Sequence, residues 1–263
     1  MPDKRGLKAA LGTSEVTRAG GDLGKSLLAE FIGVFFINYF GCMSCINVGS
    51  HDPKSLVLIA LTFGFVVMIA VQSLGHVSGA HLNPAVTCGA LVVGKVTIIR
   101  AALYIVAQCL GGIAGTGVLK AVTPTEFQQT LGSTLVSEPL TIPQAIAVEF
   151  LLGFVLIFVV FGVTDPNKPE AKIPAPLAIG LAVVIGHLSS IQYTGSSMNP
   201  ARSLGSAIAS NNWANHWVYW LGPCLGGIAA ALLYTFVFAA PPITTQYSPV
   251  QMKRLDGKEE ENA

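Results

Sequence analysis

Two stretches of the sequence decide the fold, because each places the triplet Asn-Pro-Ala at the start of a short apolar segment. They read Ser78-Gly-Ala-His-Leu-Asn-Pro-Ala-Val-Thr87 and Thr194-Gly-Ser-Ser-Met-Asn-Pro-Ala-Arg-Ser203. Asparagine suits the N-cap of a helix, and proline suits the first helical position because its missing N–H is not needed there. About ten helical residues cover only about 15 Å, half of a bilayer's hydrocarbon core. Each stretch is therefore predicted to form a re-entrant half-helix.

Composition places the rest of the chain in a membrane. Of its 263 residues, 52% are hydrophobic and 11% are charged, well below the roughly 25% charged residues usual for soluble domains. Apolar stretches of about 20 residues, the length that crosses the hydrocarbon core, recur six times. They lie near residues 27–47, 56–74, 98–119, 143–163, 173–190 and 217–239. We predict an all-α membrane protein with six transmembrane helices and two re-entrant half-helices.

The two halves of the chain repeat one another. Cys109-Leu-Gly-Gly-Ile-Ala114 recurs at Cys224-Leu-Gly-Gly-Ile-Ala229, an offset of 115, and the two Asn-Pro-Ala triplets are offset by 116. Glu30-Phe and Glu149-Phe follow the same order at an offset of 119. Each copy holds three spans, so the second copy enters the membrane from the opposite side. The sequence therefore predicts an inverted 3+3 repeat.

Lys and Arg residues predict the orientation, because cytoplasmic loops carry an excess of them. Twelve of the fifteen fall on one side of a six-span chain: Lys4, Arg5, Lys8, Arg18, Lys25, Lys95, Arg100, Lys168, Lys172, Lys253, Arg254 and Lys258. Both termini are thus expected in the cytosol. The expected division is a cytosolic tail at 1–25, a channel domain at 26–240 with repeats at 26–120 and 143–240, and a cytosolic tail at 241–263. A net charge of +1 argues against a nucleic-acid partner.

Inverted symmetry brings the N-termini of the two half-helices together near the membrane midplane, where each contributes about +0.5 of a charge. This positive region is expected to repel cations, including hydronium. The motif residues are Asn83, Pro84, Ala85, Asn199, Pro200 and Ala201. The two asparagine amides are expected to donate to passing water. Irregular backbone is tolerated at this depth where it lines a cavity, so the carbonyls of Gly79, Ala80, His81, Gly195 and Ser197 are expected to form a ladder.

From about residue 25 to 240 the sequence resembles the aquaporins, or major intrinsic proteins, and both motifs are similar to those of the water-selective, animal-type branch. The resemblance implies that the narrowest point of the pore is formed by Phe63, His187, Ser196 and Arg202. It also implies that Glu30 and Glu149 hydrogen-bond the backbone of the re-entrant loops. A homotetramer with one pore per subunit is likewise implied.

The expected function is a passive, water-selective channel in the plasma membrane, driven by osmotic gradients and excluding protons and ions. No cofactor, metal ion or enzymatic activity is expected. An alternative is a channel that also passes urea or glycerol. A secondary transporter is a second alternative, since transporters share inverted repeats and broken helices, but ion coupling would need Glu30 or Glu149 in the lumen. An intramembrane hydrolase using Ser196 and His187 lacks a G-x-S-x-G motif and an acidic orienting residue.

The five cysteines lie in or beside apolar spans. Cys42 and Cys45 form a C-x-x-C pair without a second pair of ligands. A buried structural role is therefore preferred for this pair over a metal or redox site.

Overall fold

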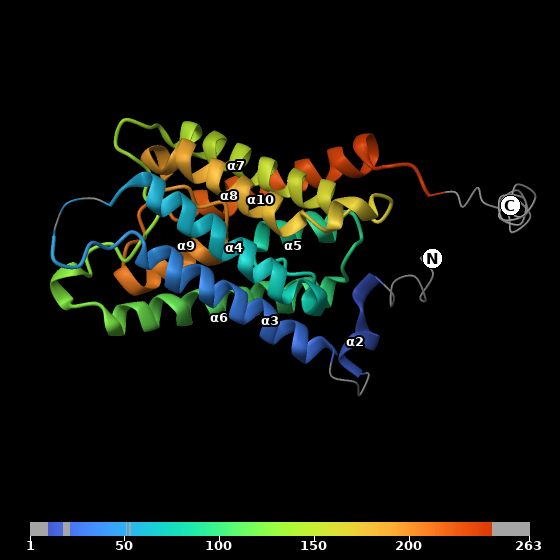
Figure 1. The fold of residues 1–263 in the computed structure, drawn as a ribbon, viewed down its shortest axis with the longest axis horizontal. Coiled ribbons are helices and arrows are strands. Elements are labelled where there is room, and N and C mark those ends of the chain that lie inside the picture. The colour runs from blue at the N-terminus through green and yellow to red at the C-terminus, as the bar shows by residue number, and fades with distance from the viewer. Residues whose placement is uncertain (1–9, 18–21, 51, 53, 244–263) are drawn as a thin grey trace, which may run out of the picture.

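The computed structural model describes residues 10–17, 22–50, 52 and 54–243, and this part of the chain is helical with no strand. Six helical segments are long and apolar enough to cross a membrane, and they run side by side along one axis (Figure 1). They are α3 (Asp22–Phe36) with η1 (Ile37–Gly41), α4 (Leu56–Ser78), α6 (Ile98–Val122), α7 (Ile142–Val163), α8 (Ala175–Thr194), and α10 (Val218–Leu233) with η4 (Tyr234–Phe238). The predicted six-span fold is confirmed.

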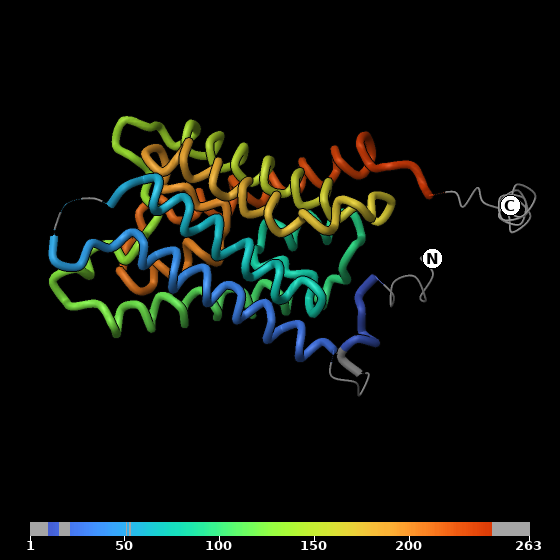
Figure 2. Tube along the Cα trace, in the orientation of Figure 1, coloured from blue at the N-terminus to red at the C-terminus, as the bar shows by residue number. Residues whose placement is uncertain are grey.

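Each of the two Asn-Pro-Ala triplets begins a short helix. They are α5 (Pro84–Val92) and α9 (Pro200–Ser210), whose 9 and 11 residues cover about 14 and 17 Å. The trace in Figure 2 follows the chain through both of them. Neither is long enough to cross the membrane, as predicted.

Helices from different repeats enclose the half-helices. The spanning helix α6 packs against α9, and its repeat-related partner α10 packs against α5. Glycines allow these close approaches: a Cβ on Gly227 would lie 2.8 Å from the Ala85 carbonyl oxygen, and one on Gly112 would clash with the Ala201 carbonyl. Each half-helix is thus held by the last spanning helix of the other repeat.

Three predicted spans need their ends corrected, and one of them is the second, which was predicted at 56–74 but ends at Ser78. The first was predicted at 27–47 but begins at Asp22 and ends at Gly41. Its apolar composition continues beyond the helix, and the Ser44 hydroxyl, which donates to the Gly41 carbonyl over 2.6 Å, lies in the turn that follows. The fifth was predicted at 173–190 but runs over Ala175–Thr194, ending at Gly195 with φ +77°. Hydropathy marks the apolar part of a helix, and helical turns with polar residues extend beyond it.

The predicted N-terminal tail is partly structured. Within it, α2 (Thr13–Thr17) lies against the start of α6, where Glu15 forms an ion pair with Arg100 and accepts a hydrogen bond from Thr97 over 2.9 Å. Helix α3 also begins inside the segment predicted as tail. Residues 1–9, 18–21 and 244–263 lie outside the described residues, so most of the predicted C-terminal tail at 241–263 receives no description.

The glycine contacts predict a strong difference between two chemically identical substitutions. A Cβ on Gly226 of α10 would clash with the Phe150 carbonyl of α7, whereas one on Gly117 of α6 would meet open space. We expect Gly226→Ala to lower the free energy of unfolding by about 1–3 kcal/mol through overpacking. Gly117→Ala should leave it unchanged or raise it by up to about 1 kcal/mol, the intrinsic helix preference for alanine. Thermal unfolding of both variants in detergent tests this, and equal midpoints would contradict the packing argument.

Candidate functional site

The two loops that lead into the half-helices adopt the same unusual backbone conformation. Helices α4 and α8 both end at a left-handed glycine, Gly79 with φ +85° and Gly195 with φ +77°. Beyond these glycines, Ala80, Leu82, Ser196 and Met198 also have φ between +46° and +56°. Such conformations cost L-residues about 1–2 kcal/mol each. Contacts from the surrounding helices must therefore hold both loops in place.

Two buried carboxylates provide these contacts. Glu30 of α3 accepts hydrogen bonds from the backbone N–H groups of His81 over 2.9 Å and Leu82 over 2.6 Å. In the other repeat, Glu149 of α7 accepts from Ser197 over 2.9 Å and Met198 over 3.0 Å. Both carboxylates also accept from the hydroxyl that ends the preceding helix, Ser78 or Thr194, over 2.6 Å. The described loop N–H groups at these positions therefore have carboxyl oxygens as acceptors in place of water.

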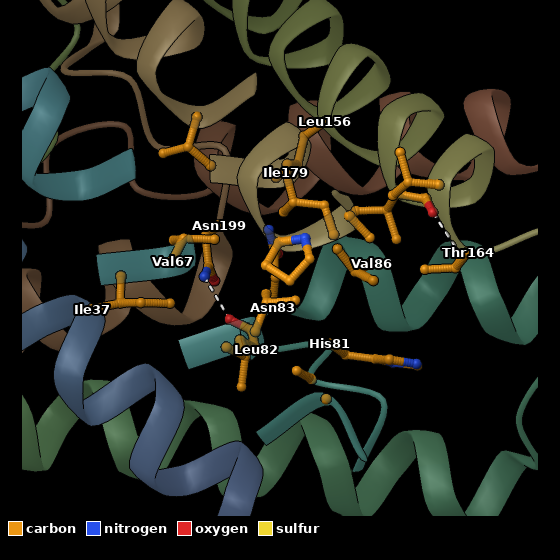
Figure 3. A pocket seen from close by; sticks show the side chains of 18 of the residues that line it. Ile37, Val67, His81, Leu82, Asn83, Val86, Leu156, Thr164, Ile179 and Asn199 are labelled. Atoms are coloured by element: carbon orange, nitrogen blue, oxygen red, sulfur yellow. Dashed lines mark hydrogen bonds between the residues drawn. The ribbon is translucent and has the colours of Figure 1, made fainter. Parts of the chain in front are cut away.

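Asn83 and Asn199 cap their half-helices and also join the two repeats. Each side-chain oxygen accepts from the backbone N–H two residues later, over 2.9 Å at Ala85 and 3.0 Å at Ala201. The Asn83 amide nitrogen donates to the Met198 carbonyl, and the Asn199 amide nitrogen donates to the Leu82 carbonyl, both over 2.8 Å; the second bond is drawn in Figure 3.

This geometry limits how many donors the two amides can offer to passing water. A side-chain amide carries two N–H donors, and one on each asparagine bonds the opposite loop. Asn83 and Asn199 nevertheless both line the cavity. One donor of each amide therefore remains for a solute.

The cavity that these residues line has a volume of about 910 Å³. Apolar side chains from both repeats, among them Val67, Val86 and Ile179, form much of its wall (Figure 3). Of the predicted carbonyl ladder, Gly79, Ala80, His81 and Ser197 line the cavity. Gly195 does not, because its backbone packs against Thr134, whose Cα would lie 2.9 Å from a Cβ there.

Phe63, His187 and Arg202 meet in one buried cluster of this cavity. The Phe63 and His187 rings are stacked with centroids 4.4 Å apart, and the Arg202 guanidinium carbon lies 4.8 Å from the Phe63 centroid, which is cation–π distance. Ser196 is fully buried but does not line the cavity. The structure thus brings three of the four predicted filter residues together and leaves the fourth in the adjoining loop.

Arg202 is held by groups that the sequence did not reveal. Its Nη1 donates to the Gly132 carbonyl over 2.6 Å and to the Ser206 hydroxyl over 3.3 Å, and its own carbonyl accepts from Asn38 over 3.1 Å. Gly132, with φ +71°, lies in the connection between the repeats. The glycine at position 132 was the only sequence signal for a special backbone role there. A glycine alone does not identify Arg202 as the partner.

Few buried polar atoms in the described residues lack a hydrogen-bond partner. They are Asn38 Oδ1, Gln108 Oε1, His187 Nε2, Ser196 Oγ and Arg202 Nε. Three of these five belong to the predicted filter. Because buried polar groups are almost always paired, the unpaired nitrogens of His187 and Arg202, which both line the cavity, point to a solute that supplies the missing bonds.

Asp165, which follows α7, fixes the connection between α7 and α8. Its carboxylate accepts from the Ala240 N–H and the Tyr234 hydroxyl, each over 2.9 Å. The hydrogen bond from Ala240, with help from Asn167 and Tyr234, holds the pKa of Asp165 below its ordinary value. Ala240, the second residue after η4, is thereby tied to the α7–α8 connection, where Thr164 and Lys172 line the cavity.

Replacing Glu149 by glutamine tests the loop contacts. An amide presents one acceptor oxygen in place of two, so either the Ser197 or the Met198 N–H loses its partner. We expect Glu149→Gln to lower the free energy of unfolding by about 1–3 kcal/mol, the cost of an unsatisfied buried donor, and to reduce solute flux. Glu138→Gln is the matched control, because Glu138 is exposed. Detergent unfolding and liposome flux measure both, and a Glu149→Gln protein as stable as the control would refute the assignment.

Comparison with known proteins adds independent evidence. The family model described as major intrinsic protein matches residues 20–234. Aquaporin-4 of Mus musculus is 44% identical over 217 residues, covering 81% of this chain and 67% of its own. Aquaporin FA-CHIP of Pelophylax lessonae is 42% identical over 225 residues, covering 82% and 83%. Human aquaporin-2 is 41% identical over 217 residues, covering 82% and 80%.

Among solved structures, the aquaglyceroporin from Plasmodium falciparum superimposes with a TM-score of 0.73, covering 82% of this chain and 96% of its own. At 22% identity this likeness supports the fold alone. The sequence matches to the family model and to the three aquaporins confirm the resemblance drawn from the two motifs. The chain therefore belongs to the major intrinsic protein family, the aquaporin channels of lipid bilayers.

Proposed function

We propose that this aquaporin is a passive, water-selective channel of the plasma membrane, driven by osmotic gradients and impermeable to protons and ions. The observation that carries the proposal is the buried cluster of Phe63, His187 and Arg202 in a cavity that both pore asparagines also line. Selectivity in such pores follows from diameter, lining donors and electrostatic barriers. All three are provided by the described side chains.

Entry into the narrow region requires a solute to leave bulk water. A water molecule beside His187 Nε2 and Arg202 Nε would recover hydrogen bonds there, and both atoms are buried without another partner. The stacked Phe63 and His187 rings restrict the width. A single water is therefore favoured over glycerol, whose carbon backbone is bulkier.

Ion exclusion follows from fixed positive charge. Arg202 carries a full charge, and the N-termini of α5 and α9 add about +0.5 each. The single amide donors left on Asn83 and Asn199 orient a water at the midplane so that its hydrogens point away along the pore. This orientation interrupts the proton-hopping chain.

The transporter alternative is disfavoured by the contacts of its two candidate acids. Glu30 and Glu149 are fully buried, and both oxygens of each accept hydrogen bonds from loop N–H groups. Neither carboxylate is free to bind a transported ion. The hydrolase alternative lacks an orienting acid, since His187 Nδ1 lies 3.0 Å from the Val183 carbonyl. We therefore propose a channel without enzymatic activity.

Orientation and assembly complete the proposal. Helix α2 and the end of η4 lie at the same end of the bundle (Figure 1), which supports placing both termini on one side, and the Lys and Arg distribution assigns that side to the cytosol. A homotetramer with one pore per subunit is proposed from family resemblance. Exposed apolar side chains such as Leu151, Ile185 and Leu188 offer surface to lipid or to neighbouring subunits.

Widening the constriction tests the selectivity proposal. Proteoliposomes with the native chain should shrink rapidly in stopped-flow osmotic measurements and take up glycerol and urea at background rates. The double variant His187→Ala with Arg202→Val removes the ring and the charge. We expect its glycerol uptake to rise about tenfold or more, equivalent to lowering the barrier by about 1.4 kcal/mol.

Leu188→Ala is the matched control, because Leu188 adjoins His187 on α8 but is exposed. Its glycerol uptake should equal that of the native chain. Equal water and glycerol permeability in the native chain would overturn the proposed selectivity. Unchanged uptake in the folded double variant would show that the filter lies elsewhere.

A further inference from the structure

The first span contains a single π-helical turn beside the proposed filter. Helix α3 continues into this turn, η1 (Ile37–Gly41), whereas its repeat-related partner α7 (Ile142–Val163) is α-helical throughout. Single π turns inside α-helices are rare and are often found at functional sites. Asn38, the second residue of the turn, is fully buried and does not line the cavity. Its side chain therefore acts on the protein and not on a solute.

The Asn38 amide joins α6 to α9. Its Nδ2 donates to the Thr116 hydroxyl oxygen over 2.8 Å and to the Arg202 carbonyl oxygen over 3.1 Å. The Thr116 hydroxyl itself donates to the Gly112 carbonyl over 3.1 Å. Both neighbours of Nδ2 are thus acceptors, which fixes the orientation of the amide. Its Oδ1 is buried without a hydrogen-bond partner in the described residues, so the two donated bonds are what an asparagine contributes here.

The corresponding crossing in the other repeat is filled by an apolar side chain. A Cβ on Gly112 would lie 3.5 Å from Asn38 Nδ2, and one on the repeat-related Gly227 would lie 3.1 Å from Ile157 Cδ1. An offset of 119, the same as that between the two Glu-Phe pairs, also relates Asn38 to Ile157. An isoleucine therefore packs this position, and packing alone does not require an asparagine with an unpaired oxygen.

The groups that the amide bonds also have apolar counterparts in the other repeat. The offsets of 115 and 116 place Ala231 where the first crossing has Thr116, and Val86 where it has Arg202. The asparagine therefore occurs at the crossing that carries the filter arginine, and the crossing without the arginine lacks it.

The same π turn contacts two further parts of the filter. A Cβ on Gly41, its last residue, would clash with the Phe63 ring, so the ring lies directly against the backbone of the turn. Cys42 follows, and a Cβ on Gly132 would lie 2.7 Å from the Cys42 Cβ. The Gly132 carbonyl is the acceptor for Arg202 Nη1. One turn thus contacts the ring, the backbone of the arginine and the loop that binds its guanidinium.

We propose that Asn38 is a positioning residue for selectivity, whose amide holds the Arg202 backbone in a fixed place relative to the turn that supports Phe63. The inference rests on the proposed function, because both concern the same filter. The guanidinium carbon lies 4.8 Å from the Phe63 centroid, and this separation depends on where α9 lies relative to η1. Loss of the amide bond lets the separation vary, and a pore of variable width discriminates less between water and larger solutes.

Replacing Asn38 by leucine removes both donors at a similar side-chain size. In stopped-flow measurements on proteoliposomes, the ratio of glycerol to water permeability should rise about three- to tenfold, the factor that corresponds to one lost hydrogen bond. Ile157→Val is the matched control, because it removes a buried methyl from the repeat-related crossing, and its ratio should equal that of the native chain. Asn38→Leu in an Arg202→Val background should add no further rise, because the asparagine acts through the arginine.

The double variant His187→Ala with Arg202→Val, measured alongside, separates this inference from the proposed function. A rise in its glycerol uptake without a rise in Asn38→Leu would overturn the positioning role and leave the filter in place. No rise in the double variant would overturn the filter itself, and the role of Asn38 with it. An equal rise in Ile157→Val, or an additive rise in the Arg202→Val background, would also overturn the positioning role. If Asn38→Leu does not fold, Asn38→Ala removes the same donors with a smaller side chain and should show the same rise.

Discussion

The need to hydrogen-bond backbone groups inside a membrane is the constraint on which the rest of this structure depends. Two loops reach the membrane interior in non-helical conformations, and unpaired N–H groups there would cost several kcal/mol each. Glu30 and Glu149 satisfy those of His81, Leu82, Ser197 and Met198. The position of each half-helix, and therefore the position of each pore asparagine, follows from this pairing.

Charge in the interior is used sparingly and with different partners. The two carboxylates each bind loop N–H groups, whereas Arg202 binds a carbonyl from the connection between the repeats and faces the Phe63 ring. Glu30 and Glu149 therefore hold loops of the protein itself. Arg202, in contrast, keeps its Nε without a hydrogen-bond partner in the described residues. This division separates the groups that hold the loops from the group that we propose meets the solute.

Local chemistry explains which features the sequence predicts well. The length of an apolar run determines whether it can cross a bilayer, and Asn followed by Pro marks a helix start, so six spans and two half-helices were predictable. The ends of the helices were harder to predict, because Asp22 and Thr194 are polar residues that still belong to helices. Gly79 and Gly195 follow α4 and α8 directly and adopt left-handed conformations. A glycine at each of these positions was therefore a usable sequence signal for the end of the helix.

Contacts between distant segments explain what was missed. The bonds from Asn83 to Met198 and from Arg202 to Gly132 join residues 115 and 70 positions apart, and no pattern within either segment specifies its partner. Phe63 and His187 were placed in one site through family resemblance, since neither residue type nor spacing relates an aromatic in the second span to a histidine in the fifth. Predicting the proposed filter therefore required the family resemblance, whereas predicting the half-helices required only physical chemistry.

The exchange of half-helices between the repeats also limits how such a molecule can arise. Because α5 packs against α10 and α9 against α6, one repeat by itself lacks the last spanning helix that packs against its half-helix, and it lacks a second asparagine. A single-repeat ancestor could have built this pore only as a pair of identical chains inserted in opposite orientations. Joining the two copies then fixed one orientation for each, and it allowed residues at equivalent positions of the two repeats to differ.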